Sequence, residues 1–114
     1  MSAGSIKVKQ LSVVEERFWD FIRFVKNNIP ADTIPDFERE IEEPAMRAIK
    51  AGDPIDMGQL LAYMLLPKYK LDEHTLMKKV EDLVRSVTKD YQTYVSTTFE
   101  VAKSRRNKLL RKLA

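Results

Sequence analysis

The chain has 114 residues, of which 44% are hydrophobic and 32% charged, and it carries a formal net charge of +3. This length suits one domain with its own hydrophobic core. The lack of cysteine excludes a disulfide scaffold and thiolate metal ligands and is typical of a cytoplasmic protein. No apolar run approaches the roughly 18 residues of a membrane-spanning helix, and residues 1–10 lack the apolar stretch of a signal peptide.

The charge is unevenly distributed along the chain. Residues 1–60 carry 8 basic and 11 acidic side chains, whereas residues 61–114 carry 12 basic and 6 acidic ones. A chain polarised in this way can bind two kinds of partner, or it can pack its acidic half against its basic half.

The first predicted helix follows a short polar segment. Residues 1–10 are small and polar and predict a flexible N-terminal arm. Ser12 and Glu15 form an S-x-x-E capping box, which is typical of a helix start. Apolar residues then recur on one helix face, at Val14, Phe18, Phe21, Ile22 and Val25. Trp19 and Phe24 lie on the two flanks of that face and widen its apolar surface, so we expect them in a protein interface.

Proline and glycine residues mark the ends of the next helices. Pro35 suits the first turn of a second helix, whose acidic start complements the positive end of the helix dipole. Pro44 predicts a kink or a new helix that stops at Gly52. The pair Asp53-Pro54 predicts the cap and first turn of a third helix, and Pro67 ends it. The apolar residues expected to face inward are Phe37 and Ile41, followed by Met57, Leu60, Leu61, Met64 and Leu65.

The last 47 residues, Lys68–Ala114, contain no glycine and no proline. Their apolar residues keep one helical phase from Leu76 to Leu113. A single helix over that stretch would be about 57 Å long at 1.5 Å per residue, whereas a compact domain of this size is roughly 35 Å across. The segment, which Asp72 is expected to cap, therefore either breaks or projects beyond its domain. We expect a break at residues 86–88, because Ser and Thr compete for backbone hydrogen bonds.

These elements predict an all-α fold, a four- to five-helix bundle with a long basic C-terminal helix, in a single domain over residues 11–114. Apart from Ile6–Val8, no stretch alternates convincingly between apolar and polar residues, so we expect little β-structure. The side chains expected to pack together in the core are Phe18, Phe21, Ile22, Leu61, Leu65, Leu83, Val87 and Tyr91.

The polar side chains argue against an enzyme. His74 is the only histidine, which excludes a two-histidine metal site, and its place in the first turn of a helix predicts a surface residue. No G-x-S-x-G or phosphate-binding glycine motif is present. The acidic run Asp36–Glu43 lacks the Glu-x-x-His of a carboxylate di-metal bundle, so a solvated acidic face is the better interpretation. We therefore expect no catalytic residue, no metal and no cofactor.

Six cations and no acid close the last predicted helix, namely Lys103, Arg105, Arg106, Lys108, Arg111 and Lys112. Cations at a helix C-terminus complement its dipole, but that effect covers only the last turn and the cluster extends over nearly three. The cluster is therefore a candidate for binding nucleic-acid phosphates or an acidic partner, with a solvated helix end as the alternative. Arg105 lies on the apolar stripe of the helix, which predicts that the stripe meets another molecule there.

The C-terminal half has a recognisable order of elements. Leu71-Asp72 is followed by the apolar run Leu76–Val84, and a long helix then closes in Arg105–Ala114. This order, over residues 58–114, resembles the helical domain of archaeal GINS subunits. The residues that match the family's ending are Arg105, Lys108, Leu109, Leu110, Leu113 and Ala114. The resemblance implies a non-enzymatic subunit of the replicative helicase assembly, which bridges the unwinding motor and other replication proteins through helix–helix contacts.

The leading hypothesis is a non-enzymatic α-helical subunit of a nucleic-acid-processing assembly, most specifically a GINS-like scaffold in DNA replication. The alternative is a small helical protein that itself binds DNA or RNA through phosphate contacts of its basic C-terminal helix. Such a protein could be the small subunit of an RNA-guided defence complex or a viral DNA-coating protein. In either case we expect protein partner subunits or a homo-oligomer, and no membrane.

Overall fold

Helices make up nearly all of the chain that the structure describes. This computed structural model describes the backbone of residues 5–6 and 8–113 and the side chains of residues 15–113. The elements in chain order are β1 (Ser5–Ile6), α1 (Val8–Lys26), the 3-10 helix η1 (Ala31–Thr33), α2 (Ile34–Phe37), the π-helix η2 (Glu38–Glu42), α3 (Glu43–Ala51), β2 (Ile55–Asp56), α4 (Met57–Met64), the 3-10 helix η3 (Pro67–Tyr69), α5 (Glu73–Val84) and α6 (Tyr91–Leu113). The predicted all-α fold with a long C-terminal helix is confirmed.

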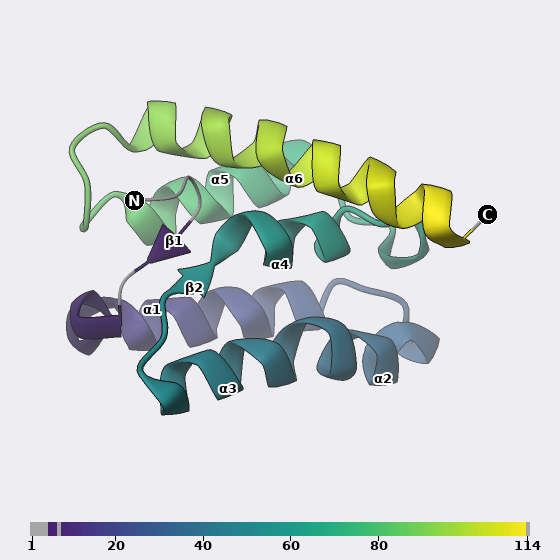
Figure 1. Cartoon of the computed structure of the whole chain (residues 1–114), viewed down its shortest axis with the longest axis horizontal. Helices are drawn as coiled ribbons and strands as arrows, with labels where there is room; N and C mark the ends of the chain where they lie inside the picture. The colour runs from purple at the N-terminus through teal and green to yellow at the C-terminus, as the bar shows by residue number, and fades with distance from the viewer. Residues whose placement is uncertain (1–4, 7, 114) are drawn as a thin grey trace.

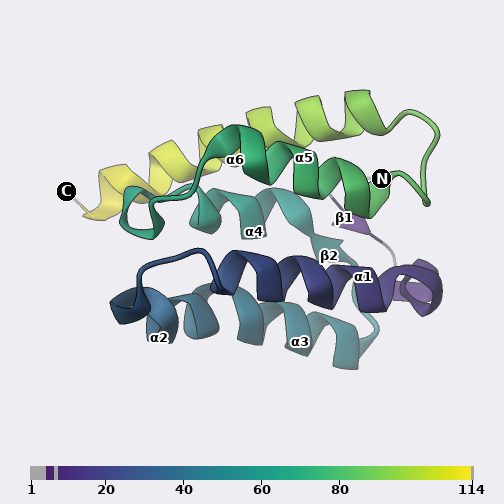
Figure 2. The same cartoon turned by 180° about the vertical axis from the view of Figure 1, so that it is seen from behind.

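Helix α4 is the central element of the bundle. Figure 1 shows α1 and α3 below it and α6 above it, and the reverse view in Figure 2 shows α5 next to both α6 and α1. Helix α4 is accordingly buried at Met57, Gly58, Leu60, Leu61, Ala62 and Met64. The molecule measures 37 × 26 × 23 Å, so α6, about 34 Å long at 1.5 Å per residue, extends along its longest dimension.

The buried apolar side chains form one cluster. Of the expected core, six residues are buried, and Val87 and Tyr91 are half-buried and packed against the cluster. The six are Phe18, Phe21, Ile22, Leu61, Leu65 and Leu83. The apolar stripe of the C-terminal segment is buried at Leu76, Val80, Val84, Val95 and Ala102, whereas Leu113 at its far end is exposed.

Helix α1 begins before the predicted capping box. Its first residue is Val8, so the start predicted at Ser12 is wrong. The spacing of Val8, Leu11 and Phe18 continues the helical period upstream of the box, and this pattern favours the earlier start. Of the predicted arm, residues 1–4 and 7 lie outside the described residues, Ser5–Ile6 forms β1 and residues 8–10 belong to α1.

The helix that contains Pro44 does not stop there. From α2 to α3 the helical backbone continues through η2, whose π-helical turn precedes the proline. The Glu43 N–H donates to the Glu38 carbonyl, five residues back, and such a turn is one way for a helix to accommodate a residue without an N–H. Helix α3 ends at Gly52 as predicted, with a φ of 75° in the left-handed region that glycine adopts without strain.

The cap of α4 is Asp56 rather than the predicted Asp53-Pro54 pair. The Asp56 carboxylate accepts from the Gln59 N–H at 3.2 Å. The chain between Pro54 and α4 is extended because Ile55 and Asp56 pair in antiparallel fashion with Ile6 and Ser5. The helix start therefore moves to the next residue that can cap it.

The C-terminal segment forms two helices, as predicted. Helix α5 ends at Val84 and α6 begins at Tyr91, with the expected break at residues 86–88 inside the connection. Asp72 caps α5, because its carboxylate accepts from the Thr75 N–H at 2.9 Å. The reversal lays α6 back along α5 and brings its basic end to the opposite end of the molecule from the α5–α6 connection (Figure 1).

Candidate interface at the end of helix α6

Two of the six clustered cations are bonded within the chain. Lys103 Nζ lies 2.8 Å from Glu73 Oε2 at the start of α5. Arg105 Nη1 donates to Asp56 Oδ2 at 2.8 Å, at the start of α4. The prediction that Arg105 meets another molecule is therefore not supported, because its guanidinium has a partner in its own chain.

The contact of Arg105 depends on a close approach of α4 and α6. Gly58 follows the Asp56 cap, and a Cβ built on it would lie 3.2 Å from Val101 Cγ1 and 3.4 Å from Arg105 Nη1. Both distances leave little room for a side chain at position 58. The absence of a side chain at this glycine thus lets α6 lie close enough for Arg105 to reach the α4 cap.

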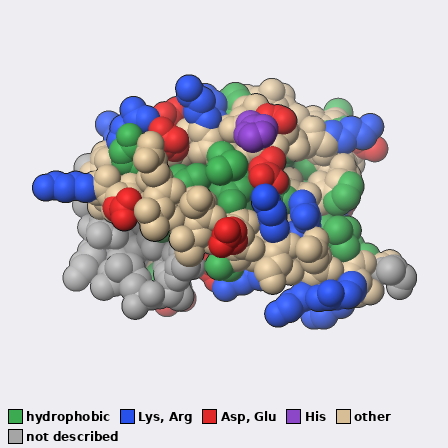
Figure 3. Space-filling view, turned by 90° about the horizontal axis from the view of Figure 1, so that it is seen from above, with side chains coloured by type: hydrophobic (Ala, Val, Ile, Leu, Met, Phe, Trp, Pro, Cys, Tyr) green, Lys and Arg blue, Asp and Glu red, His purple; other side chains and the backbone are tan. Residues whose placement is uncertain are grey.

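The other four cations form what we call the α6 end: Arg106, Lys108, Arg111 and Lys112. None of them has an ion pair among the described side chains, and Lys108, Arg111 and Lys112 are exposed. Arg106 is half-buried and donates to its neighbour Asn107 Oδ1 at 3.3 Å. Figure 3 shows Lys and Arg side chains gathered at the end of the molecule where α6 ends.

The α6 end also carries an exposed apolar side chain. Leu113 is 74% exposed, whereas Leu109 and Leu110, one turn earlier, are half-buried against the core. The helix dipole explains cations in the last turn, at Arg111 and Lys112, but not those further back. The α6 end can therefore bind a negatively charged surface and bury a leucine at the same time.

Trp19 and Phe24 lie closer to the core than predicted. Both are half-buried and packed against the hydrophobic cluster. The Trp19 ring meets Phe18 edge to face at 5.1 Å, and Lys79 Nζ lies 4.3 Å from the centre of the Phe24 ring. Among the described side chains, the exposed large hydrophobic ones are Met46 and Leu113.

The acidic run, which was predicted to be a solvated face, is bridged by lysines of the same chain. Lys26 Nζ lies 3.1 Å from Glu38 Oε2 and 3.2 Å from Glu42 Oε1. On the other side, Lys68 Nζ lies 3.1 Å from Asp36 Oδ2 and 3.0 Å from Glu40 Oε2. The run therefore binds cations of its own chain on both flanks, one from α1 and one from η3.

The tyrosine next to Lys68 also bonds to the acidic run. Tyr69 is fully buried, and its hydroxyl donates to Glu40 Oε1 at 2.5 Å. Burial, followed by the neighbouring Glu40 carboxylate, raises the pKa of the Tyr69 hydroxyl. The hydrogen bonds from Arg39 and then Lys68 lower the pKa of the Asp36 carboxyl. Asp36 and Glu40 are thus held against η3, which supplies Lys68 and Tyr69.

No group of described residues forms a metal site. His74 is exposed in the first turn of α5, as predicted. No three His, Asp or Glu side chains in the described part come together as metal ligands. The Tyr94 hydroxyl and Thr98 Oγ1 on α6 are buried without a hydrogen-bond partner among the described atoms, and burial raises the pKa of Tyr94 to about 12. None of the described helices is both long and apolar enough to cross a membrane.

Comparison with protein families, with curated proteins and with solved structures found no match to this chain.

The sequence indicates the six cations as one group, and the structure separates Lys103 and Arg105 from the α6 end. The sequence pattern also places Leu113 on the buried stripe and misses its exposure. The sequence signal that could have indicated this exposure is the position of Leu113 in the last turn of the helix, beyond the packed residues.

Proposed function

We propose that the protein is a non-enzymatic α-helical subunit of a nucleic-acid-processing assembly and that the α6 end is its docking element. The observation that carries the proposal is the combination of four cations with no described acidic partner and the exposed Leu113. Interfaces combine a buried apolar contact with a polar rim, and the α6 end offers both.

The resemblance of residues 58–114 to the helical domain of archaeal GINS subunits supports a more specific proposal. In this proposal the assembly is the replicative one, and the chain acts as a scaffold through helix–helix contacts. Lys108, Leu109, Leu110 and Leu113 match the family's ending and lie in the last turns of α6. The matching residue Arg105 is the exception, because it holds Asp56 within the chain.

The test replaces three cations of the α6 end in the full-length chain. We expect the triple change Arg106→Glu, Lys108→Glu and Arg111→Glu to remove co-purifying subunits of a nucleic-acid-processing complex when the tagged protein is isolated from its cells. The measurement is quantitative mass spectrometry of the co-purified proteins. A matched control makes the same change in charge at exposed cations elsewhere, with Arg47→Glu, Lys50→Glu and Lys78→Glu. Equal losses in the two triple variants would contradict the proposal.

Direct binding of DNA or RNA is the second candidate, because the same four cations can contact phosphates. Fluorescence anisotropy with single-stranded and duplex oligonucleotides over a salt series measures it. If the α6 end contacts phosphates on duplex DNA, the triple variant should lower the slope of log K against log salt by about 0.9 for each phosphate that is no longer bound. If the unaltered protein does not bind either oligonucleotide, this second candidate is wrong and the scaffold role is favoured.

A further inference from the structure

Helix α6 has one face that packs in the core near its start and is open at its end. Val95, Phe99 and Ala102 lie on this face, and each is at most 4% exposed. At about 3.6 residues per turn, Leu113 follows Val95 by about five full turns. It therefore lies on the same face, yet it is 74% exposed. Figures 1 and 2 show that α6 continues past the end of α4, the helix on which it packs. The last turns of α6 thus carry a core-type face without the helix that covers it further back.

The residues of the α6 end divide between two opposite faces of the helix. At about 100° per residue, the residues within about 60° of Leu113 form what we call the inner face. The inner face consists of Arg106, Leu109, Leu110 and Leu113. The outer face, on the opposite side, consists of Lys108, Arg111 and Lys112. The four cations therefore surround the helix, and a single strand of phosphates along one side of it cannot contact them all.

Arg106 is the cation of the inner face. Its side chain is half-buried, and its Nε and Nη2 both donate to the amide oxygen of the next residue, Asn107, at 3.3 Å. No carboxylate pairs with Arg106 among the described side chains. A guanidinium holds five N–H donors in a planar fork that matches a carboxylate. Arg106 can therefore bind a carboxylate beside the open leucine.

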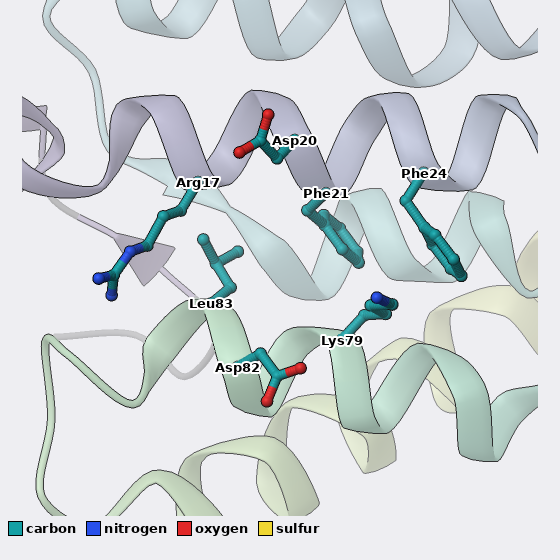
Figure 4. Close-up of a pocket in the computed structure, with 7 residues that line it drawn as sticks. All are labelled: Arg17, Asp20, Phe21, Phe24, Lys79, Asp82 and Leu83. Carbon is teal, nitrogen blue, oxygen red and sulfur yellow. The ribbon is translucent and has the colours of Figure 1, made fainter.

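The sign of the charge indicates the chemistry of the partner at the α6 end, in contrast to the groove between α1 and α5. That groove encloses about 280 Å³, and Figure 4 shows charges of both signs around it, Arg17 and Lys79 with Asp20 and Asp82. Its mixed rim favours a partner of neither sign. Residues 101–114 contain no acid, and the cations of the α6 end have no described acidic partner. An acidic partner complements this surface.

Two other sources of negative charge fit the inner face less well. A second copy of the chain cannot offer its acidic run freely, because Lys26 and Lys68 already pair with four acids of residues 36–43. Nucleic acid supplies phosphates, but its bases stack on aromatic side chains, and residues 100–114 contain none. Neither source covers Leu113 and pairs with Arg106 at the same time.

We propose that the inner face of the α6 end binds an amphipathic helix of a partner protein, with apolar side chains along one side and carboxylates beside them. The apolar side chains pack on Leu109, Leu110 and Leu113, and a carboxylate accepts two hydrogen bonds from Arg106. The spacing of the inner face, three and four residues, is that of the ridges through which helices pack. The partner helix takes the place beside α6 that α4 has further back. This inference rests on the proposed function, because it names the partner's chemistry at the same site.

The test uses two synthetic peptides labelled with fluorescein, and fluorescence anisotropy measures their binding. The first is about 20 residues long, enough to form a helix, with leucine at every third or fourth position and glutamate and alanine elsewhere. The second replaces the leucines with serine and keeps the charge. We expect the leucine peptide to bind about tenfold more tightly, because burial of leucine stabilises the complex. A single-stranded oligonucleotide of the same net charge should bind no more tightly than the serine peptide.

Single substitutions locate the bound peptide. Leu113→Ser and Arg106→Gln should each weaken binding of the leucine peptide about tenfold, whereas Lys108→Gln, on the outer face, should weaken it less. The matched controls are Met46→Ser, at another exposed large hydrophobic side chain, and Lys78→Gln, at an exposed cation of α5. Both should bind the peptide normally. Circular dichroism verifies that each variant is folded.

Four results would overturn the proposal. The first is a leucine peptide that binds no better than the serine peptide, or not at all at millimolar concentration. The second is a folded Leu113→Ser variant that binds normally. The third is a Lys108→Gln variant weakened as much as Arg106→Gln, which would place the peptide on the outer face. The fourth is an oligonucleotide that binds more tightly than both peptides, which would favour nucleic acid.

Failure of this inference and failure of the proposed function are distinguishable. If the peptide does not bind but the triple variant of the α6 end still loses its co-purifying subunits, the α6 end docks through another chemistry. If the peptide binds and co-purification is unchanged, the proposed function is wrong and the inner face remains a binding surface.

Discussion

The acidic run at residues 36–43 and the α6 end are both strongly charged segments of helix, yet they differ in whether the chain supplies their counter-charges. Lysines from elsewhere in the chain, Lys26 and Lys68, form ion pairs with Glu38, Glu40 and Glu42. The cations of the α6 end form no ion pair with an acid in the described part of the molecule. A run of like charge in a sequence therefore does not reveal whether its counter-charges are internal or must come from another molecule.

The difference arises from position in the bundle. Residues 36–43 run alongside α1 and beneath η3, so lysines distant in sequence reach them from both flanks. The α6 end follows Ala102, which is fully buried, and within it Leu109 and Leu110 are half-buried against the core, whereas Leu113 is exposed. We expect changes in the first region to lower stability and changes in the second to affect binding.

The largest effect on stability should follow the loss of the buried Tyr69 side chain, which contacts the acidic run. Tyr69→Ala removes a fully buried ring that meets Phe37 edge to face at 6.1 Å and should lower the free energy of unfolding by about 3–5 kcal/mol. Tyr69→Phe keeps the ring and removes only the hydrogen bond to Glu40, so it should cost about 1–2 kcal/mol. Urea unfolding followed by circular dichroism measures both. Equal losses in the two variants would show that the ring contributes little.

A smaller effect should distinguish the two cations of the basic cluster that are bonded within the chain from the four cations of the α6 end. Asp56→Ala removes the α4 cap and should cost about 1 kcal/mol. A double-mutant cycle with Arg105→Ala should give a coupling energy of about 0.5 kcal/mol, as is usual for partly exposed ion pairs. Arg106→Ala should stay within about 0.5 kcal/mol of the unaltered protein. Coupling of Asp56 to Arg106 instead of Arg105 would contradict the structure.

The smallest effect should appear in the stability of the protein at acidic pH. The pKa of the Asp36 carboxyl is held below its ordinary value of 3.8 by Arg39 and then Lys68, so its ionised form stabilises the folded state. That contribution is present above pH 3.8 and is lost as the pH falls through the lower value in the folded protein. Lys68→Met should therefore flatten the decline of the unfolding midpoint in this range. An unchanged acid profile in Lys68→Met would show that the bridge does not contribute to the pH dependence.

Local chemistry was readable from the sequence where a single residue decides the outcome. Gly52 ends α3 because it adopts the left-handed conformation, and Asp72 caps α5 because its carboxylate reaches a free N–H. In the connection between α5 and α6, Thr88 Oγ1 accepts a hydrogen bond from the Asp90 N–H at 3.3 Å. These features depend on neighbours within a few residues, and local patterns describe such neighbours well.

Features that depend on distant contacts were not readable. Asp56 replaces the predicted cap because β1 holds the preceding residues extended. The bond of Arg105 to Asp56 connects positions 49 residues apart, and no periodicity in the sequence points to such a pair. The candidate site could therefore be located by composition, but its division into two cations bonded within the chain and four with no described acidic partner needed the fold.

Asp56 also has a consequence for the order in which the chain becomes structured. It pairs with Ser5 near the start of the chain, caps α4 locally, and receives Arg105 near the end. Contacts between distant positions close large loops and form late, because the entropy of closure must be met before the contact stabilises the chain. During synthesis the N-terminal end leaves the ribosome first. The centre of this bundle therefore stays incomplete until α6 has been made.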